Sequence, residues 1–141
     1  MVSCGLGTPS EVDILNHKAE NFMILTTDTD KNLDSAIVVL KLALSKDSLH
    51  KKSHANLATA LSLKGEHESA VKTWKKFTDI FPEDIGANFF YGMELLCTNR
   101  KNESKFVLLK CVNWYKKKIN KTPTKDDIIT CLLYTSPSPR D

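Results

Sequence analysis

Two histidines, His50 and His54, stand four residues apart, which is the spacing that places two imidazole rings on one face of a helix. Such a pair can bind a transition metal when further ligands lie nearby. No cysteine, aspartate or glutamate accompanies the pair at ligand spacing, and the pair straddles the expected start of a helix. We therefore interpret both histidines as solvated side chains, and we expect no metal site and no cofactor.

The chain has four cysteines, and their spacing does not fit a disulfide framework. Cys4, Cys97, Cys111 and Cys131 are scattered and form no Cys-x-x-Cys pair. The N-terminal segment 1–10 lacks the basic start and the apolar core of a secretory signal. This pattern is typical of buried, reduced thiols in a cytoplasmic protein.

Motifs that carry catalysis are missing from the sequence. It contains no phosphate-binding glycine loop, no Gly-x-Ser-x-Gly elbow and no pair of carboxylates in a recognisable context. The Gly-Leu-Gly segment at 5–7 is too short to count as a phosphate loop. We predict no catalytic residue, and we expect a protein that is not an enzyme.

A basic segment at 116–121 follows two aromatic residues, Trp114 and Tyr115. Lysines beside aromatic rings can contact RNA or an anionic membrane. Lysines at the end of a helix also complement its dipole, which is an alternative explanation for the segment. Arginine, which supplies bidentate and stacking contacts to nucleic acids, occurs only at Arg100 and Arg140. The segment gives no clear indication of a nucleic-acid partner.

The composition is that of an ordinary globular chain. Hydrophobic residues make up 41% of the 141 residues, charged residues make up 26%, and the formal net charge is +3. A chain of this length has room for one domain. No apolar run approaches the roughly 20 residues that a membrane-spanning helix needs, so we expect no membrane span.

Spacing of the apolar residues predicts helical hairpins. Between 54 and 63 they recur at the spacing of one helix face, and Gly65 follows in a position suited to the left-handed end of a helix. Between 68 and 81 apolar residues recur with a period near 3.6, and Pro82 cannot continue that helix. Two helices joined by so short a turn form an antiparallel hairpin.

The segment 51–84 resembles a tetratricopeptide repeat, in which large and small residues occupy fixed positions on two helices. On the first helix, Leu57, Ala58 and Leu61 match the large, small and large positions. The turn and second helix add four matches, at Gly65, Ala70, Trp74 and Pro82. Phe77 departs from the pattern, which has a small residue at that position.

A shift by the length of this segment, 34 residues, tests the pattern in the forward direction. It places Tyr91, Gly92, Leu95, Ser104, Leu108 and Cys111 on the positions of the pattern. The proline position holds Lys116, and the second helix is expected to continue to about residue 118. The forward unit therefore reads as a second repeat.

A backward shift matches only the second helix of the preceding unit. The matching residues are Ala36, Leu40 and Ala43. The first helix, expected over roughly 10–27, has Met23 and Ile24 where the pattern has a large and a small residue. The polar stretch 26–32 predicts a long or frayed turn. This leading repeat is degenerate.

The predicted fold class is all-α, with antiparallel helical hairpins stacked as a short α-solenoid of the tetratricopeptide type. We expect an N-terminal lead-in over 1–16 and a repeat array of about three hairpins over 17–118. A further helix is expected to begin within 119–130, where Thr124 can cap it and acidic residues follow.

The last residues, 131–141, resemble one reading frame of sequencing-adapter DNA translated as protein, and the match covers all 11 residues. The alternative is a genuine tail rich in proline and serine. On the first interpretation the natural protein continues beyond residue 130, and this chain is a fragment of it.

The resemblance implies a concave groove along the first helices, where repeats of this kind hold extended peptides or partner helices. The repeat register assigns six residues to this groove: Lys52, Asn56, Thr59, Phe89, Phe90 and Met93. The aromatic and methionine side chains favour an apolar anchor from the partner, with Asn56 bonding a backbone amide. Alternatively, Phe89 and Phe90 pack against a neighbouring helix.

Lys52 and Asn56 also resemble part of the clamp by which some members of the family hold a C-terminal carboxylate. The other clamp positions hold Asn21, Leu25, Gly86 and Phe90, so binding of such a tail is not favoured. We expect a non-catalytic scaffold that binds a protein or peptide partner in the groove. The alternative is a helical accessory region of a larger enzyme or RNA-processing factor, whose functional domain lies beyond residue 130.

Overall fold

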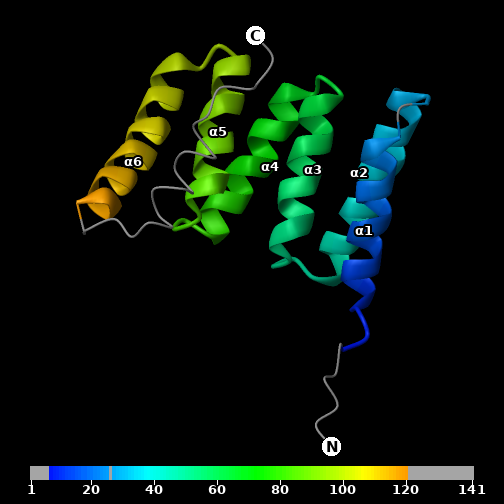
Figure 1. Ribbon diagram of the computed structural model, residues 1–141. Helices are drawn as coiled ribbons and strands as arrows, with labels where there is room; N and C mark the ends of the chain where they lie inside the picture. The colour runs from blue at the N-terminus through cyan, green and yellow to red at the C-terminus, as the bar shows by residue number, and fades with distance from the viewer. Residues whose placement is uncertain (1–6, 26, 121–141) are drawn as a thin grey trace, which may run out of the picture.

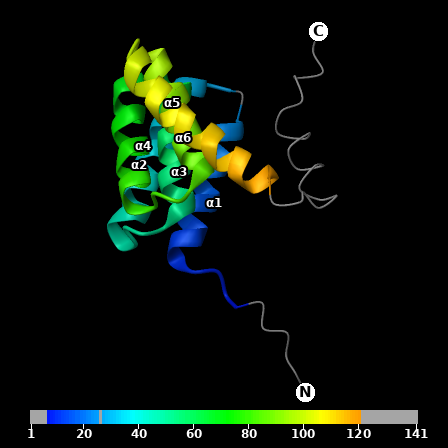
Figure 2. The same cartoon turned by 90° about the vertical axis from the view of Figure 1, so that its left-hand side faces the viewer.

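The computed structural model describes residues 7–25 and 27–120, and within them the chain forms six α-helices. Their bounds are α1 Glu11–Ile24, α2 Thr29–Lys46, α3 Lys51–Leu63, α4 His67–Ile80, α5 Ile85–Cys97 and α6 Lys101–Ile119. Consecutive helices are antiparallel and pair as α1/α2, α3/α4 and α5/α6, and the pairs stack in chain order (Figures 1 and 2). The predicted all-α fold of stacked hairpins is confirmed.

The turns inside the second and third hairpins have the same geometry, 34 positions apart. Gly65 has a φ of 82° and Asn99 a φ of 61°, so both adopt the left-handed conformation predicted for Gly65. In each turn two backbone amides donate to carbonyls of the preceding helix. Gly65 N donates to Ser62 O (2.9 Å) and Glu66 N to Leu61 O (2.9 Å), as Asn99 N donates to Leu96 O (3.0 Å) and Arg100 N to Leu95 O (2.8 Å).

Helix starts repeat at the same interval. His50 caps α3 by accepting a hydrogen bond from the Ser53 amide through Nδ1 (3.2 Å), and Asp84 caps α5 by accepting one from the Ala87 amide (3.0 Å). The two capping residues are again 34 positions apart. Turns and caps therefore establish a structural repeat, although the residues that serve each cap differ in type.

The first hairpin has its own start and turn. Ser10 and Asp13 form a capping box, so α1 begins at Glu11, within the residues expected as a lead-in. The stretch 26–32 was predicted to form a long or frayed turn, but α1 ends at Ile24 and α2 begins at Thr29, so residues 29–32 of that stretch are helical. Asp28 precedes α2 in the left-handed conformation at φ 50°. The division into repeat units stays a prediction. Residues 121–141, which include the expected further helix and the adapter-like segment, lie outside the described residues.

Small residues lie buried where the helices of a hairpin meet. Ala58, Ala70 and Ser104 are each 0% exposed, and Gly92 is buried as well. Ser104 Oγ also donates a hydrogen bond to the carbonyl oxygen of Gly92 (2.7 Å), which ties α6 to α5. These are the residues that the repeat pattern requires to be small, and their lack of bulk lets the helix axes approach.

His54 is part of the core, so its interpretation as a solvated side chain is wrong. It is 1% exposed, its Nε2 donates a hydrogen bond to the Ser48 carbonyl (2.8 Å), and its ring stacks on Phe77 with centroids 5.7 Å apart. Phe77 also stacks on Trp74 at 6.0 Å. The large residue at position 77 is accommodated because an imidazole ring, flat and partly apolar, lies against it.

Trp74 is 4% exposed and belongs to a core cluster built from α3, α4 and α5. The other buried members are Ala58, Val71, Phe77, Ala87, Tyr91 and Leu95. We expect Trp74→Ala to lower the free energy of unfolding by about 3–5 kcal/mol, because it leaves a large cavity among aromatic side chains. Chemical denaturation followed by circular dichroism measures this. Trp114→Ala on α6 is the matched control: Trp114 is only half-buried, and its loss should be clearly smaller. Equal losses would contradict the central role of Trp74.

Gly92 gives a second test, because a Cβ added there would lie 2.6 Å from Leu108 Cδ2 and 2.8 Å from its Cγ. An alanine gains up to about 1 kcal/mol in helix propensity, but overpacking costs about 1–3 kcal/mol. We expect Gly92→Ala to be destabilising in the same assay. The control is Gly86→Ala on the same helix, whose Cβ would meet Asp84 Oδ1 at an ordinary 3.5 Å. A stabilising Gly92→Ala would show that the two helices do not need this contact.

Candidate functional site

The first helices of the three hairpins, α1, α3 and α5, are linked side by side by polar contacts. Between α1 and α3, Asn56 Nδ2 donates to Asn16 Oδ1 (3.1 Å). Between α3 and α5, Ser62 Oγ donates to Glu94 Oε2 (2.8 Å). We call the exposed side of these three helices the first-helix face. Of the six residues that the sequence assigned to a groove, Lys52, Asn56 and Thr59 lie on α3, and Phe89, Phe90 and Met93 lie on α5.

The α5 part of this face is apolar and exposed. Phe89 is 45% exposed, Phe90 54%, Met93 42% and Leu96 44%. The Phe90 ring stacks on Trp74 of α4, with centroids 5.5 Å apart, and meets the Phe89 ring edge-on at 5.7 Å. The alternative in which Phe90 packs against a neighbouring helix is confirmed for one side of its ring, while about half of its surface remains exposed. Its role as an anchor for a partner stays a prediction.

The α3 part of the face is polar, and its side chains are engaged within the chain. Asn56 is half-buried, and its Nδ2 donates both to Asn16 and to Glu20 Oε1 (3.0 Å). Thr59 is exposed, and its hydroxyl donates to the Ala55 carbonyl of its own helix (2.9 Å). The predicted bond from Asn56 to a partner's backbone therefore competes with two internal acceptors.

Glu20 explains why the clamp-like pair is poorly placed to hold a C-terminal carboxylate. Its own carboxylate accepts the hydrogen bond from Asn56 and lies 3.8 Å from Lys52 Nζ. The hydrogen bond from Asn56 is the main cause that lowers the pKa of Glu20 below its ordinary value, with Lys52 assisting. An internal carboxylate thus occupies the position next to Lys52 and Asn56, and a partner's carboxylate would meet its repulsion.

A second cluster lies between α3, α4 and α5, where the sequence indicated no site. His67, Glu94 and Cys97 bring a nitrogen, a carboxylate oxygen and a sulfur within 4.8 Å of one another. His67 and Glu94 stand 27 positions apart, so no local motif reveals them. The prediction of no metal site considered only His50 and His54, and it did not address this arrangement.

The prediction of buried thiols holds for one of the two cysteines that the structure describes. Cys111 is buried, and burial raises the pKa of its thiol. Cys97, the last residue of α5, is exposed, so the prediction is wrong for that residue. Cys4 and Cys131 lie outside the described residues.

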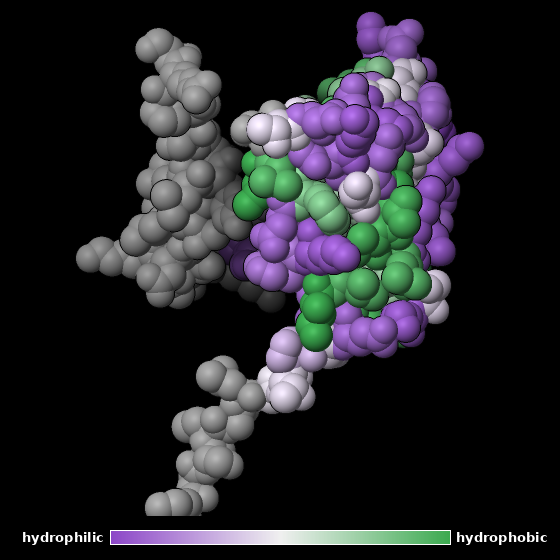
Figure 3. All heavy atoms as spheres, turned by 90° about the vertical axis from the view of Figure 1, so that its right-hand side faces the viewer, coloured by the Kyte–Doolittle hydropathy of each residue, from purple (hydrophilic) through white to green (hydrophobic). Residues whose placement is uncertain are grey.

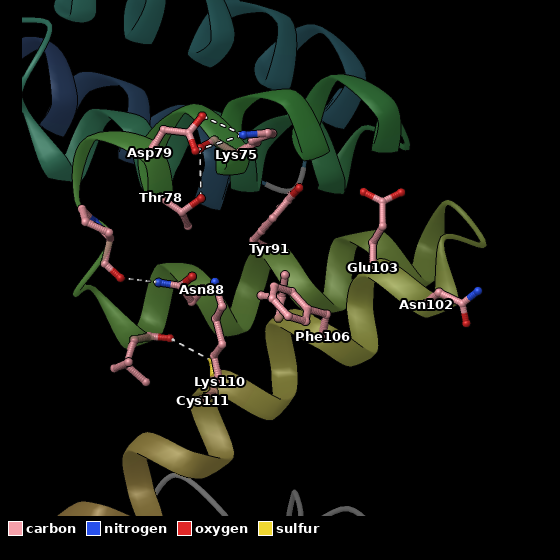
Figure 4. Close-up of a pocket in the computed structure, with 13 residues that line it drawn as sticks. Lys75, Thr78, Asp79, Asn88, Tyr91, Asn102, Glu103, Phe106, Lys110 and Cys111 are labelled. Carbon is pink, nitrogen blue, oxygen red and sulfur yellow. Dashed lines mark hydrogen bonds and ion pairs between the residues drawn. The ribbon is translucent and has the colours of Figure 1, made fainter.

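A hollow of about 720 Å³ lies between α4 and α6, with α5 beneath it. Figure 4 shows its polar rim, where Lys75 forms an ion pair with Asp79 (2.8 Å), and the Phe106 side chain between α5 and α6. Asn88 Nδ2 donates to the Pro82 carbonyl (3.1 Å) and closes one end. These polar groups are paired with one another, and the hollow brings together no recognisable set of catalytic residues.

The end of the stack at α1 and α2 also carries apolar side chains, as Figure 3 shows. Ile14 of α1 is 55% exposed, and Val38 of α2 is 67% exposed. Among the described helices, this hairpin has a neighbouring hairpin, α3/α4, on one side only (Figure 1). The described helices do not include one that is long and apolar enough to cross a membrane.

Comparison with known proteins finds similarity in structure but not in sequence. No protein-family model matches the chain, and no curated protein matches it. Among solved structures, the crystal structure of MamA, a protein with tetratricopeptide repeats, is similar with a TM-score of 0.59 at 21% identity. The match covers 77% of this chain and 61% of MamA, so the chain spans less than two thirds of that protein.

The structure and this similarity together define the class of fold. The chain is an all-α protein whose hairpins stack as a short solenoid like that of tetratricopeptide proteins. The TM-score of 0.59 supports the fold, whereas an identity of 21% does not transfer a function, which has to be inferred from the surface of this chain.

The Glu20 contacts predict a pH dependence of stability. Because the folded-state pKa of Glu20 is lowered from its ordinary 4.5, its contribution to stability is present above that value and is lost as pH falls through the folded pKa. We expect Glu20→Gln to lose less stability than the wild type between about pH 6 and about pH 3. Thermal melts across this range measure the difference.

The matched control for this experiment is Glu83→Gln, in the exposed loop between α4 and α5. It should follow the wild-type pH profile, because Glu83 lies away from the contact between α1 and α3. If Glu20→Gln were to lose as much stability as the wild type on acidification, the Glu20 carboxylate would not support this contact.

Proposed function

We propose that the protein is a non-catalytic docking scaffold and that the first-helix face binds a partner peptide or helix through an apolar anchor. The observation that carries the proposal is the exposed stripe on α5 formed by Phe89, Phe90, Met93 and Leu96. Four large apolar side chains on one helix are each more than 40% exposed, and burying them against an apolar partner would lower the free energy of the complex.

The stripe has the physical properties of a binding surface. The Phe90 ring has a rigid support, because it stacks on the buried Trp74. Ordering this ring on binding would therefore cost little conformational entropy. The methionine adapts to the shape of an inserted side chain. The polar α3 side, with Lys52 exposed beside it, supplies a hydrophilic rim to the apolar surface.

The test uses a partner protein that the full chain captures and that is then purified. The affinity of this partner for each variant is measured directly. Phe89→Ala and Met93→Ala should each weaken binding by roughly 30-fold if they are anchor positions, which corresponds to about 2 kcal/mol. Phe90→Ala is avoided because Phe90 also packs on Trp74. Each variant is checked by its melting temperature before binding is measured.

Phe106→Ala on α6 is the matched control, since this phenylalanine is 64% exposed but lines the hollow between α4 and α6. Affinity should be unchanged by Phe106→Ala. If Phe106→Ala weakens binding while the two α5 variants do not, the partner occupies the hollow instead. If all three variants retain the wild-type affinity, the proposal for the α5 stripe is wrong.

A further inference from the structure

Three side chains of the types that bind transition metals meet at the end of the second hairpin. One ring nitrogen of His67, a carboxylate oxygen of Glu94 and Cys97 Sγ all lie within 4.8 Å of one another. Imidazole nitrogen, carboxylate oxygen and thiolate sulfur are the three ligand atoms that Zn²⁺ takes from proteins. Repeat packing does not need this combination, since none of the three residues belongs to the buried apolar positions of the hairpins.

The backbone fixes where these groups can meet. Glu94 and Cys97 are three positions apart on α5, so their side chains project from the same face of the helix. His67 is the first residue of α4, and the left-handed turn at Gly65 directs α4 back along α3. The ligand atoms therefore come from two regular helices whose relative position is set by the hairpin core, which favours a preorganised site.

Glu94 is the central group, because its carboxylate is buried and supported from both sides. The residue is 6% exposed. Its Oε2 accepts a hydrogen bond from Ser62 Oγ (2.8 Å), and its Oε1 lies 2.5 Å from His67 Nδ1. A buried carboxylate is costly unless a positive charge accompanies it. A divalent cation bound beside the carboxylate would supply that charge.

We propose that His67, Glu94 and Cys97 form a binding site for a borderline transition metal ion, with Zn²⁺ the best match. Two ligands of one tetrahedral zinc stand roughly 3.3–3.8 Å apart, since each bond is about 2.0–2.3 Å long. The most distant pair must therefore approach by about 1 Å, while His67 and Glu94 must separate by a similar amount. Both shifts are available to side chains, because His67 is 39% exposed and Cys97 is exposed.

Three protein ligands leave one position of a tetrahedral ion free for water or for a group from a binding partner. Ser62 has the role of an outer-shell residue, since its hydroxyl orients the Glu94 carboxylate. The competing explanation is an ion pair between His67 and Glu94 with no metal. Cys97 distinguishes the two, because the ion pair has no use for its sulfur.

The probe is Co²⁺, added to the full chain kept reduced and free of chelators. We expect one Co²⁺ per chain at this site, with the thiolate-to-cobalt charge-transfer absorption that a sulfur ligand produces. Cys97→Ser should abolish that absorption and should weaken binding by more than the about 10–100-fold that outer-shell changes cost. Cys111→Ser, which removes the buried thiol of α6, should leave both signals unchanged.

Ser62→Ala separates orientation from ligation. It should keep the charge-transfer absorption and lower the Co²⁺ affinity by about 10–100-fold, because the thiolate remains while the carboxylate loses its support. Far-ultraviolet circular dichroism establishes that each variant is folded. Binding without charge-transfer absorption, or absorption that persists in Cys97→Ser, would overturn the proposal and leave the ion pair as the explanation. The result is independent of whether the α5 stripe binds a partner.

Discussion

The hairpins depend on close contact between two helices, and that contact exists because one helix offers a small residue where the other carries a large one. In the third hairpin, Gly92 leaves room for Leu108, whose side chain occupies the volume that a Cβ would need. In the second, Ala58 is 0% exposed and shares a core cluster with Trp74. Without these small residues the helix axes would separate, and the aromatic core would open to water.

This contact also determines which side chains the molecule exposes. Once α4 packs against α3 and α5, Trp74 is enclosed and becomes the support on which Phe90 lies. On α5, Phe89, Met93 and Leu96 are each more than 40% exposed, so no described helix covers them fully. The same packing brings the start of α4 to the end of α5, so that His67 meets Glu94 across the hairpin boundary. Both the stripe and the proposed metal site are consequences of how the hairpins stack.

Polar contacts adjust this arrangement from one hairpin to the next. The contact between α1 and α3 relies on Asn56, Asn16 and Glu20, while that between α3 and α5 relies on Ser62 and Glu94. Buried or half-buried polar groups need partners, so each of these contacts also limits the relative positions of the helices. In the contact between α1 and α3, the Glu20 carboxylate lies beside Lys52 and Asn56 and leaves less room there for a ligand.

The sequence by itself determined the hairpins, because their signals are local. The period of apolar residues, the glycine at position 65 and the small residues at 58, 70, 92 and 104 act within one or two helices, and all are found where they were expected. The start of α2 was missed because seven polar residues in a row predict a loop, whereas α2 begins among them at Thr29. Tertiary packing stabilises the start of α2, which its polar composition does not predict to be helical.

Only the tertiary structure decided the environment of individual side chains. His54 was expected in solvent, but it is buried, because its ring stacks on Phe77 and its Nε2 donates a hydrogen bond to the Ser48 carbonyl. The internal bonds of Asn56 and the contact between His67 and Glu94 join residues that lie from 27 to 40 positions apart. Spacing along a chain carries no information about such pairs, because the distances between them are fixed by how the helices pack against one another.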